Sequence, residues 1–167
     1  PRKARALSVS AIRDPDPVIF YEPKRIYRQY KEEVTDDGEA LPLDVCFVLR
    51  DGSDVTLVTW GAQVKETLEA AEALEKQGIS AEVIDVATIK PLDFDTIHES
   101  VKKTGRCVII HEAPRTAGFG AEVAAQLAEK AMFDLVAPVE RVTGYDTHIP
   151  LFRLEMKYLP SVEKIIA

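Results

Sequence analysis

From Val55 onward, short β-branched runs alternate with segments of helical periodicity, and this alternation constrains the fold more than any other feature of the sequence. The sequence predicts strands at 55–60, 81–87, 106–111 and 138–142, and helices at 64–77, 93–105 and 121–133. Successive strand and helix units with short connections imply right-handed crossovers and parallel strands. We therefore expect an α/β fold, a three-layer α/β/α sandwich around a mostly parallel sheet.

The helix predicted at 64–77 shows the clearest amphipathic pattern. It places Leu68 and Leu74 on one face, and Gly78 provides a stop in the left-handed backbone region. Both leucines are expected to be buried against the sheet. The opposite face is expected to be exposed and carries a row of glutamates, Glu66, Glu69, Glu72 and Glu75.

The first part of the chain is organised differently. A short helical piece at 4–12 is followed by a proline-rich break at 14–17, and residues 27–38 are mostly polar. The apolar run 45–49 and the turn at 51–52 predict an additional edge strand. We expect residues 1–17 to end a preceding domain, 18–44 to form a linker segment, and 45–167 to form the α/β domain.

Composition excludes several classes of function. A chain of 167 residues that is 46% hydrophobic has material for one core, and its net charge of −7 argues against nucleic-acid binding. No apolar run is long enough for a membrane span, and no signal peptide is evident at the start of the sequence. Cys46 and Cys107 stand alone without metal-ligand spacing. Reduced core cysteines fit a reducing compartment, the cytoplasm or the mitochondrial matrix.

Candidate site residues follow the third predicted strand. His111, Glu112 and Arg115 occupy a strand end, where open α/β sheets bind ligands, and Gly118 and Gly120 lead into a helix N-terminus. One interpretation is an anion or substrate site. The other is a tight turn whose charged residues pair with one another or across a subunit interface. The second is favoured, because the turn lacks both the Walker lysine and the full dinucleotide spacing.

Asp146 lies close to His148 in a later loop, and such a pair raises the hypothesis of base catalysis. No nucleophile elbow accompanies it, so we expect an interface or loop-packing role. We expect no catalytic, cofactor-binding or metal-binding residue in this chain.

Seven segments, in order along nearly the whole chain, resemble the β subunits of 2-oxo acid dehydrogenase E1 components. They are Asp-Pro-Asp-Pro-Val-Ile-Phe-Tyr-Glu-Pro-Lys-Arg-Ile-Tyr-Arg at 14–28, Gly-Ser-Asp-Val-Thr-Leu-Val-Thr-Trp-Gly at 52–61, Glu-Val-Ile-Asp at 82–85, Lys-Pro-Leu-Asp at 90–93, His-Glu-Ala-Pro-Arg-Thr at 111–116, Gly-Phe-Gly-Ala-Glu at 118–122, and Ala-Pro-Val-Glu-Arg-Val-Thr-Gly-Tyr-Asp-Thr at 137–147. The sequence at 22–24 and 144–147 is more similar to branched-chain enzymes than to pyruvate enzymes. Family members usually carry a proline where His148 stands.

The resemblance implies a transketolase C-terminal-type domain in an α2β2 enzyme. Such an enzyme decarboxylates a 2-oxo acid on thiamine diphosphate and passes the acyl group to lipoyl-lysine on the E2 core. Residues 1–17 would then end the pyrimidine-binding domain. Thiamine diphosphate and magnesium would belong to the whole enzyme and not to this segment, which is expected to be inactive alone.

The partners implied by the resemblance are the E1 α subunit, a second β subunit and the subunit-binding domain of the E2 lipoyl acyltransferase. The domain would serve subunit assembly and E2 docking. The alternatives are a pyruvate or acetoin dehydrogenase β subunit, a transketolase-type enzyme acting on a sugar phosphate, and a free-standing anion- or ligand-binding α/β module.

Overall fold

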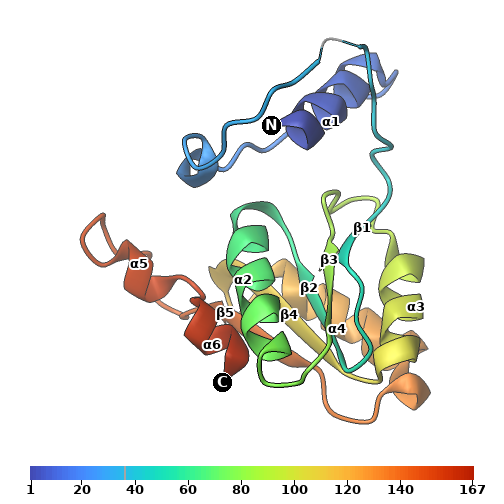
Figure 1. The fold of residues 1–167 in the computed structure, drawn as a ribbon, viewed down its shortest axis with the longest axis vertical. Helices are drawn as coiled ribbons and strands as arrows, with labels where there is room; N and C mark the ends of the chain where they lie inside the picture. The colour runs from blue at the N-terminus through green and yellow to red at the C-terminus, as the bar shows by residue number, and fades with distance from the viewer. Residues whose placement is uncertain (36) are drawn as a thin grey trace.

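The sheet is built around β2, whose β-branched residues suit a strand that is covered on both faces. The computed structural model describes residues 1–35 and 37–167. Within these residues, five strands form one sheet in the order β1-β3-β2-β4-β5 (Figure 1). Their bounds are β1 Phe47–Arg50, β2 Val55–Thr59, β3 Ala81–Asp85, β4 Cys107–Pro114 and β5 Glu140–Gly144. Strands β2 to β5 pair in parallel, and β1 joins β3 antiparallel at one edge.

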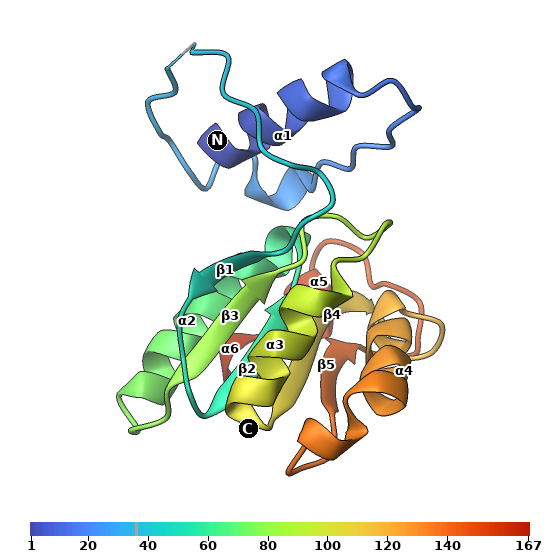
Figure 2. The same cartoon turned by 90° about the vertical axis from the view of Figure 1, so that its right-hand side faces the viewer.

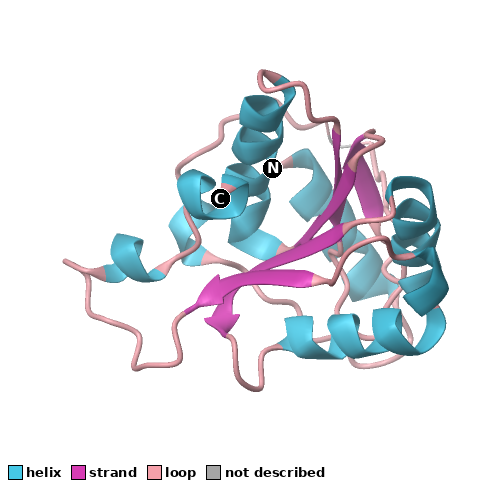
Figure 3. Ribbon diagram, turned by 90° about the horizontal axis from the view of Figure 1, so that it is seen from below, coloured by secondary structure: helices cyan, strands magenta, loops and turns pink. Residues whose placement is uncertain are grey.

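Helices cover both faces of this sheet (Figure 3). The α-helices are α1 Arg2–Arg13, α2 Val64–Glu75, α3 Phe94–Thr104, α4 Phe119–Lys130, α5 Glu155–Tyr158 and α6 Val162–Ile166. Short 3-10 turns lie at η1 Lys24–Ile26, η2 Gly61–Gln63 and η3 Met132–Asp134. Helices α3 and α4 pack on one face, and α2 and α6 on the other.

Two hydrophobic clusters stabilise the three layers, one on each face of the sheet. One joins Val58 and Ile109 to Ile97 of α3 and Leu127 of α4. The other joins strand residues such as Leu57 and Ile110 to Leu74 of α2 and Ile165 of α6. Leu57, Val58, Ile109 and Ile110 are each at most 1% exposed, so the central strands β2 and β4 have no solvated face.

Local sequence signals set the ends of α3. The Asp93 carboxylate accepts a hydrogen bond from the Thr96 amide at 3.2 Å and caps the helix. Asp95 in the first turn and Lys102 and Lys103 in the last turn suit the helix dipole. Gly105 closes the helix with a φ of +69°.

The fold class expected from the sequence is confirmed, and the differences are local. The extra strand does lie at an edge, but it pairs with β3 and not with its neighbour β2. Helix α4 begins at Phe119 and not at 121, because Gly118 already occupies the cap position. Leu74 is buried, whereas Leu68 is only partly buried and packs at the margin of the second cluster.

The N-terminal segment lies beyond the end of the sheet where the parallel strands finish (Figures 1 and 2). Lys3 of α1 forms an ion pair of 2.6 Å with Asp85, the last residue of β3. The same ammonium lies 3.9 Å from the centre of the Phe47 ring. The segment is therefore in contact with the carboxyl edge of the sheet.

The position of Leu74 predicts a large effect on stability. Leu74→Ala should lower the free energy of unfolding by about 2–5 kcal/mol, because it leaves a cavity between α2 and the sheet. Leu68→Ala should cost less, ~1–2 kcal/mol, since part of that side chain is already solvated. Chemical denaturation measures both values, with exposed Glu69→Ala as the control. Equal losses for the two leucines would contradict this assignment of the helix face.

Candidate functional site

The candidate site lies at the carboxyl ends of β2 and β4. From β2 the chain first moves to β3 on one side of the sheet and then returns to β4 on the other side. The order of strands therefore switches between β2 and β4, the place where open α/β sheets form a crevice. Trp60 follows the last residue of β2, and His111 lies in β4 beside it.

His111 is buried inside this crevice. It is 1% exposed, and its ring stacks on Trp60 with the ring centres 5.3 Å apart and the planes at 14°. Phe119, the first residue of α4, meets the other side of this cluster by packing edge-on to Trp60 at 5.5 Å. Three aromatic rings from β2, β4 and α4 thus fill the space at the strand ends.

Gly118 and Gly120 are required by the His111 ring. A Cβ at Gly118 would lie 2.5 Å from the Pro114 carbonyl oxygen and 2.7 Å from the ring Cε1, and one at Gly120 would lie 2.5 Å from both Cδ2 and Nε2. The start of α4 therefore approaches the imidazole more closely than any side chain would permit. The ring is therefore packed directly against the backbone of the turn into α4.

The surroundings of His111 disfavour its charged form. Burial lowers the pKa of the imidazole, and the positive charge of Arg141 acts in the same direction. The Ala113 backbone acts in the opposite direction, but neither ring nitrogen has a hydrogen-bond partner in the described part of the chain. The imidazole of His111 is therefore held in its neutral form and packed against Trp60.

Glu112 points to a different partner. Its carboxylate accepts a hydrogen bond from the Arg25 guanidinium at 3.1 Å, and Arg25 also pairs with Glu66 of α2 at 2.6 Å. The Glu66 hydrogen bond is the largest cause of the raised pKa of Arg25. This arginine joins the segment before the domain to two elements of the sheet layer.

Arg115 and Asp146 form the exposed rim of the site. The Arg115 guanidinium donates to the Arg141 carbonyl at 3.1 Å, and the Arg141 guanidinium donates to the Arg115 carbonyl at 3.0 Å. Asp146 accepts hydrogen bonds from the Thr116 amide at 2.8 Å and the Thr116 hydroxyl at 2.7 Å, and these contacts lower its pKa. The hydrogen bonds between Arg115 and Arg141 and those between Thr116 and Asp146 hold the 115–117 loop against the β5 side of the sheet.

The six residues singled out from the sequence lie around one strand end. The sequence analysis expected these charged residues to pair with one another or across a subunit interface, and within the chain Glu112 and Arg115 contact other partners. Glu66 was expected on an exposed helix face and is instead half-buried against Arg25. Among the described contacts of Asp146, none is with His148. The interface role of this group stays a prediction.

The sequence analysis did not single out Trp60, Arg25 or Arg141. Trp60 could have been found from its position in the sequence, since it directly follows a strand that pairs in parallel with the strand containing His111. Arg25 lies within a stretch that resembles the family, but its contact with Glu66 spans 41 residues. No local pattern predicts so distant an ion pair.

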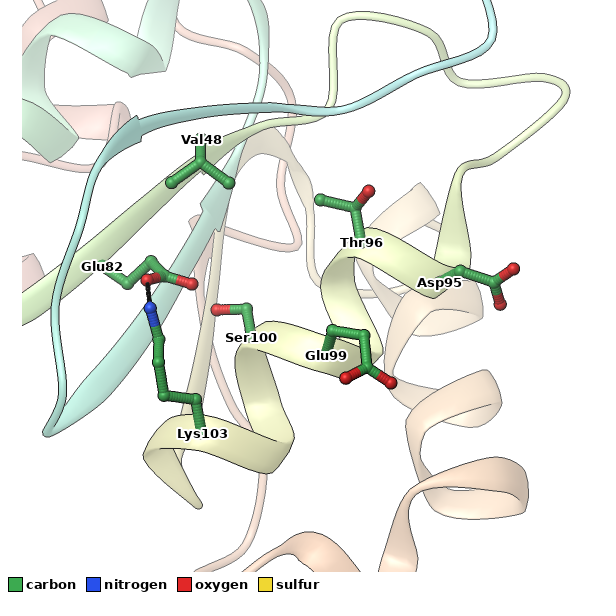
Figure 4. Close-up of a pocket in the computed structure, with 7 residues that line it drawn as sticks. All are labelled: Val48, Glu82, Asp95, Thr96, Glu99, Ser100 and Lys103. Atoms are coloured by element: carbon green, nitrogen blue, oxygen red, sulfur yellow. Dashed lines mark hydrogen bonds and ion pairs between the residues drawn. The ribbon is translucent and has the colours of Figure 1, made fainter.

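A second groove lies between the edge strand β1 and α3 (Figure 4). Glu82 of β3 is buried at its base and pairs with Lys103, which reaches it from α3. The Glu82 carboxylate also accepts a hydrogen bond from the Gly52 amide at 3.3 Å. Below it, the Thr56 hydroxyl lies 2.7 Å from the hydroxyls of Ser100 and Thr104. These polar groups satisfy one another, so the groove is explained by packing.

The described residues contain neither a metal-binding cluster nor a membrane-spanning helix. In residues 1–35 and 37–167, no group of three or more His, Cys, Asp or Glu side chains is placed to hold a metal ion. No helix in the same residues is long and apolar enough to cross a membrane. Cys46 and Cys107 are free and buried, and burial raises the pKa of each thiol to about 12.

The fold and its filled strand-end crevice define an open α/β domain whose candidate site is a packed surface. The family profile described as "Transketolase, C-terminal domain" matches residues 45–165. The chain belongs to the transketolase C-terminal domain family.

The most similar relatives include β subunits of two kinds of dehydrogenase. The chain is 49% identical over 99% of its length to "2-oxoisovalerate dehydrogenase subunit beta 2, mitochondrial" of Arabidopsis thaliana, covering 46% of that protein. It is 44% identical over 99% of its length to "Pyruvate dehydrogenase E1 component subunit beta" of Bacillus subtilis, covering 51% of that protein. The chain thus spans about half the length of the curated relatives that it matches.

A solved structure supports the same family. The chain is similar to "Split gene transketolase, inactive beta4 tetramer" with a TM-score of 0.68 and 32% identity. The match covers 81% of this chain and 43% of that one. The homologues of this chain are thus parts of enzymes, and E1 β subunits are prominent among them.

The contact between Gly120 and His111 gives a test of the packing. Gly120→Ala should lower the free energy of unfolding by about 1–3 kcal/mol, because the new methyl group overlaps the ring. At an open helix position the same change would stabilise, by ~1 kcal/mol. In a His111→Ala background the cost should become much smaller, which a double-mutant cycle measures. A stabilising Gly120→Ala in the parent chain would refute the close packing.

The lowered pKa of His111 gives a pH dependence. The unfolded chain binds a proton at His111 below a pH of about 6.5, whereas the folded chain resists protonation there. The contribution of neutral His111 to stability is therefore present above that pH and is lost as the pH falls through the lowered folded-state value. Urea denaturation between pH 7.5 and about 5 should show a steeper loss for the parent chain than for His111→Asn. Identical slopes would mean that His111 is protonated equally in both states.

Proposed function

We propose that this chain is the C-terminal domain of the β subunit of a thiamine diphosphate-dependent 2-oxo acid dehydrogenase E1 component. The support is the family match over 45–165 and the high identity to E1 β subunits over 99% of the chain. Residues 1–17 would end the pyrimidine-binding domain, 18–44 would link it, and 45–167 would form the present domain. The cellular location would be the bacterial cytoplasm or the mitochondrial matrix.

The proposed role is assembly and not bond chemistry. One observation carries it: the buried His111 ring packs against Gly118 and Gly120 at the turn into α4 and stacks on Trp60, so side chains fill the strand end. The rim residues Arg115 and Asp146 lie exposed on the loops that follow β4 and β5, and hydrogen bonds between Thr116 and Asp146 join the two loops. Such a surface suits contact with the α subunit or a second β subunit. E2 docking would use another part of the domain's exposed surface.

A free-standing anion-binding module is the alternative from another class. It would need room for a ligand beside the turn into α4, where Gly118 and Gly120 are buried and packed against the imidazole. This argues against the module and for the subunit domain.

The proposed substrate is a branched-chain 2-oxo acid. Two relatives named as 2-oxoisovalerate dehydrogenase β subunits are 49% and 48% identical to the chain, against 44–45% for the pyruvate dehydrogenase β subunits. The sequence at 22–24 and 144–147 also favours the branched-chain type. A pyruvate or acetoin dehydrogenase β subunit is the second candidate, because the margin in identity is small.

In residues 1–35 and 37–167, no group of three or more His, Cys, Asp or Glu side chains is placed to hold the magnesium that accompanies thiamine diphosphate. The turn into α4 is packed against the His111 ring. We therefore assign the cofactor to the remainder of the enzyme, and no catalytic step is derived from this chain.

The test uses the complete α2β2 enzyme. Arg115→Ala should weaken association and shift sedimentation toward smaller species, because it removes an exposed charge and a loop contact at the proposed interface. Activity per assembled tetramer should stay within about tenfold, or roughly 1.4 kcal/mol. The 167-residue chain alone, measured in the same assay, should not decarboxylate a 2-oxo acid.

Lys130→Ala, on the exposed end of α4, provides the control for loss of one positive charge. If Arg115→Ala stays fully assembled and loses several orders of magnitude in turnover, the residue belongs to an active site. Turnover by the isolated chain would overturn the domain assignment itself.

A further inference from the structure

A second feature of the strand-end crevice lies on its outer side. Trp60, Gly61 and Ala62 after β2, together with Glu112 and Ala113 of β4, form one wall of a pocket. The opposite wall is Tyr21, Glu22 and Pro23, which come from the segment that precedes the domain. The crevice at the switch in strand order is therefore covered by the chain itself.

Arg25 makes the principal polar contacts between this segment and the domain. Its two terminal nitrogens donate to the two Glu66 oxygens at 2.6 and 3.3 Å, a forked pairing. One of them also donates to the Ala62 carbonyl at 3.0 Å and to Glu112 at 3.1 Å. The guanidinium thus reaches η2, α2 and β4 at once, and its side chain is only 19% exposed.

Apolar burial holds the segment only in part. No residue from 18 to 30 is buried, and Pro23, Arg25 and Ile26 are partly buried. Val18 and Phe20 are each 40% exposed, whereas Ile19 and Tyr21 are 77% and 85% exposed. The hydrophobic effect scales with the apolar area removed from water, so the charged contact adds to an incomplete apolar attachment.

The acceptors around Arg25 form a site for a guanidinium group. Two carboxylates and a carbonyl surround it, and the Glu66 side chain is 14% exposed. If the guanidinium leaves, a half-buried carboxylate loses its counter-ion, which is costly. A lysine would bring the charge without the planar fork, and so would match this geometry poorly.

We propose that the carboxyl edge of the sheet is an intramolecular docking site for residues 18–30, with Arg25 as the anchoring ligand in a guanidinium-specific site. The crevice that binds small ligands in other open α/β folds here binds the chain's own linker. The anchor fixes the direction in which the preceding residues leave the domain. Lys3 and Asp85 provide a separate contact farther along the edge. The docking site is a property of this chain, whichever enzyme the domain belongs to.

The single tryptophan of the chain reports on docking, because Trp60 lines the pocket opposite Tyr21 and Pro23. In Arg25→Ala, acrylamide quenching of Trp60 should increase and its emission should shift to longer wavelength. Chymotrypsin cleavage after Phe20, Tyr21 and Tyr27 should become about tenfold faster or more, as expected for loss of ~1.4 kcal/mol of local stability. These cleavage sites are unchanged by the substitution.

Three variants control the experiment. Arg28→Ala removes the same charge from an exposed position on the same segment and should leave quenching and cleavage unchanged. Arg25→Lys should behave like Arg25→Ala, because charge alone does not satisfy the fork. Glu66→Gln should also release the segment, and it tests the site from the other side without altering the linker. Far-ultraviolet circular dichroism checks that each variant retains the α/β fold.

Rescue with a small molecule tests the specificity of the site. Methylguanidinium, at concentrations too low to denature the chain, should restore slow cleavage and low quenching to Arg25→Ala. Methylammonium at the same ionic strength should not. Unchanged quenching and cleavage in folded Arg25→Ala and Glu66→Gln would overturn the proposal. Equal rescue by both cations would overturn its guanidinium specificity, as would absence of rescue.

Discussion

The burial of β2 on both faces is the constraint on which the rest of the structure depends. Its parallel neighbours β3 and β4 cannot be reached by hairpins, so each connection must cross a face of the sheet as a helix. The connection from β2 to β3 runs in one direction across the sheet, and the connection from β3 to β4 runs in the opposite direction. Because both crossovers have the same hand, their helices lie on opposite faces of the sheet. This arrangement yields two separate hydrophobic clusters, and it places the switch in strand order beside Trp60 and His111.

That switch point is a place for ligands in many α/β proteins, and here two packing solutions occupy it. On the α4 side, a buried His111 packs against the turn into the helix and requires glycine at 118 and 120. On the α2 side, Arg25 brings the linker onto Glu66 and Glu112. Both solutions use groups that could serve catalysis elsewhere, and both direct them to contacts within the chain. A domain built in this way suits the placing of neighbouring domains and subunits.

The errors in the sequence predictions have identifiable causes. Helical periodicity placed Leu68 and Leu74 on one face, but α6 and the sheet cover only part of that face, so Leu68 remains partly exposed. Glu66 fits the exposed row of α2 by spacing, yet it lies in the first turn, where Arg25 reaches it. Helix α4 starts earlier than predicted because its cap is a glycine packed under a histidine ring, a signal without a local pattern.

The sequence by itself determined the strand and helix order, the parallel sheet and the family. These features depend on periodicity and motifs within short windows, which act on neighbouring residues and can be read locally. Only the tertiary structure decided that His111 is enclosed, that Glu112 contacts Arg25, and that Asp146 holds Thr116. Such contacts join residues 30 or more positions apart, and they arise when the layers pack and close the distance. Burial and pairing belong to that packing, because they depend on which surfaces meet.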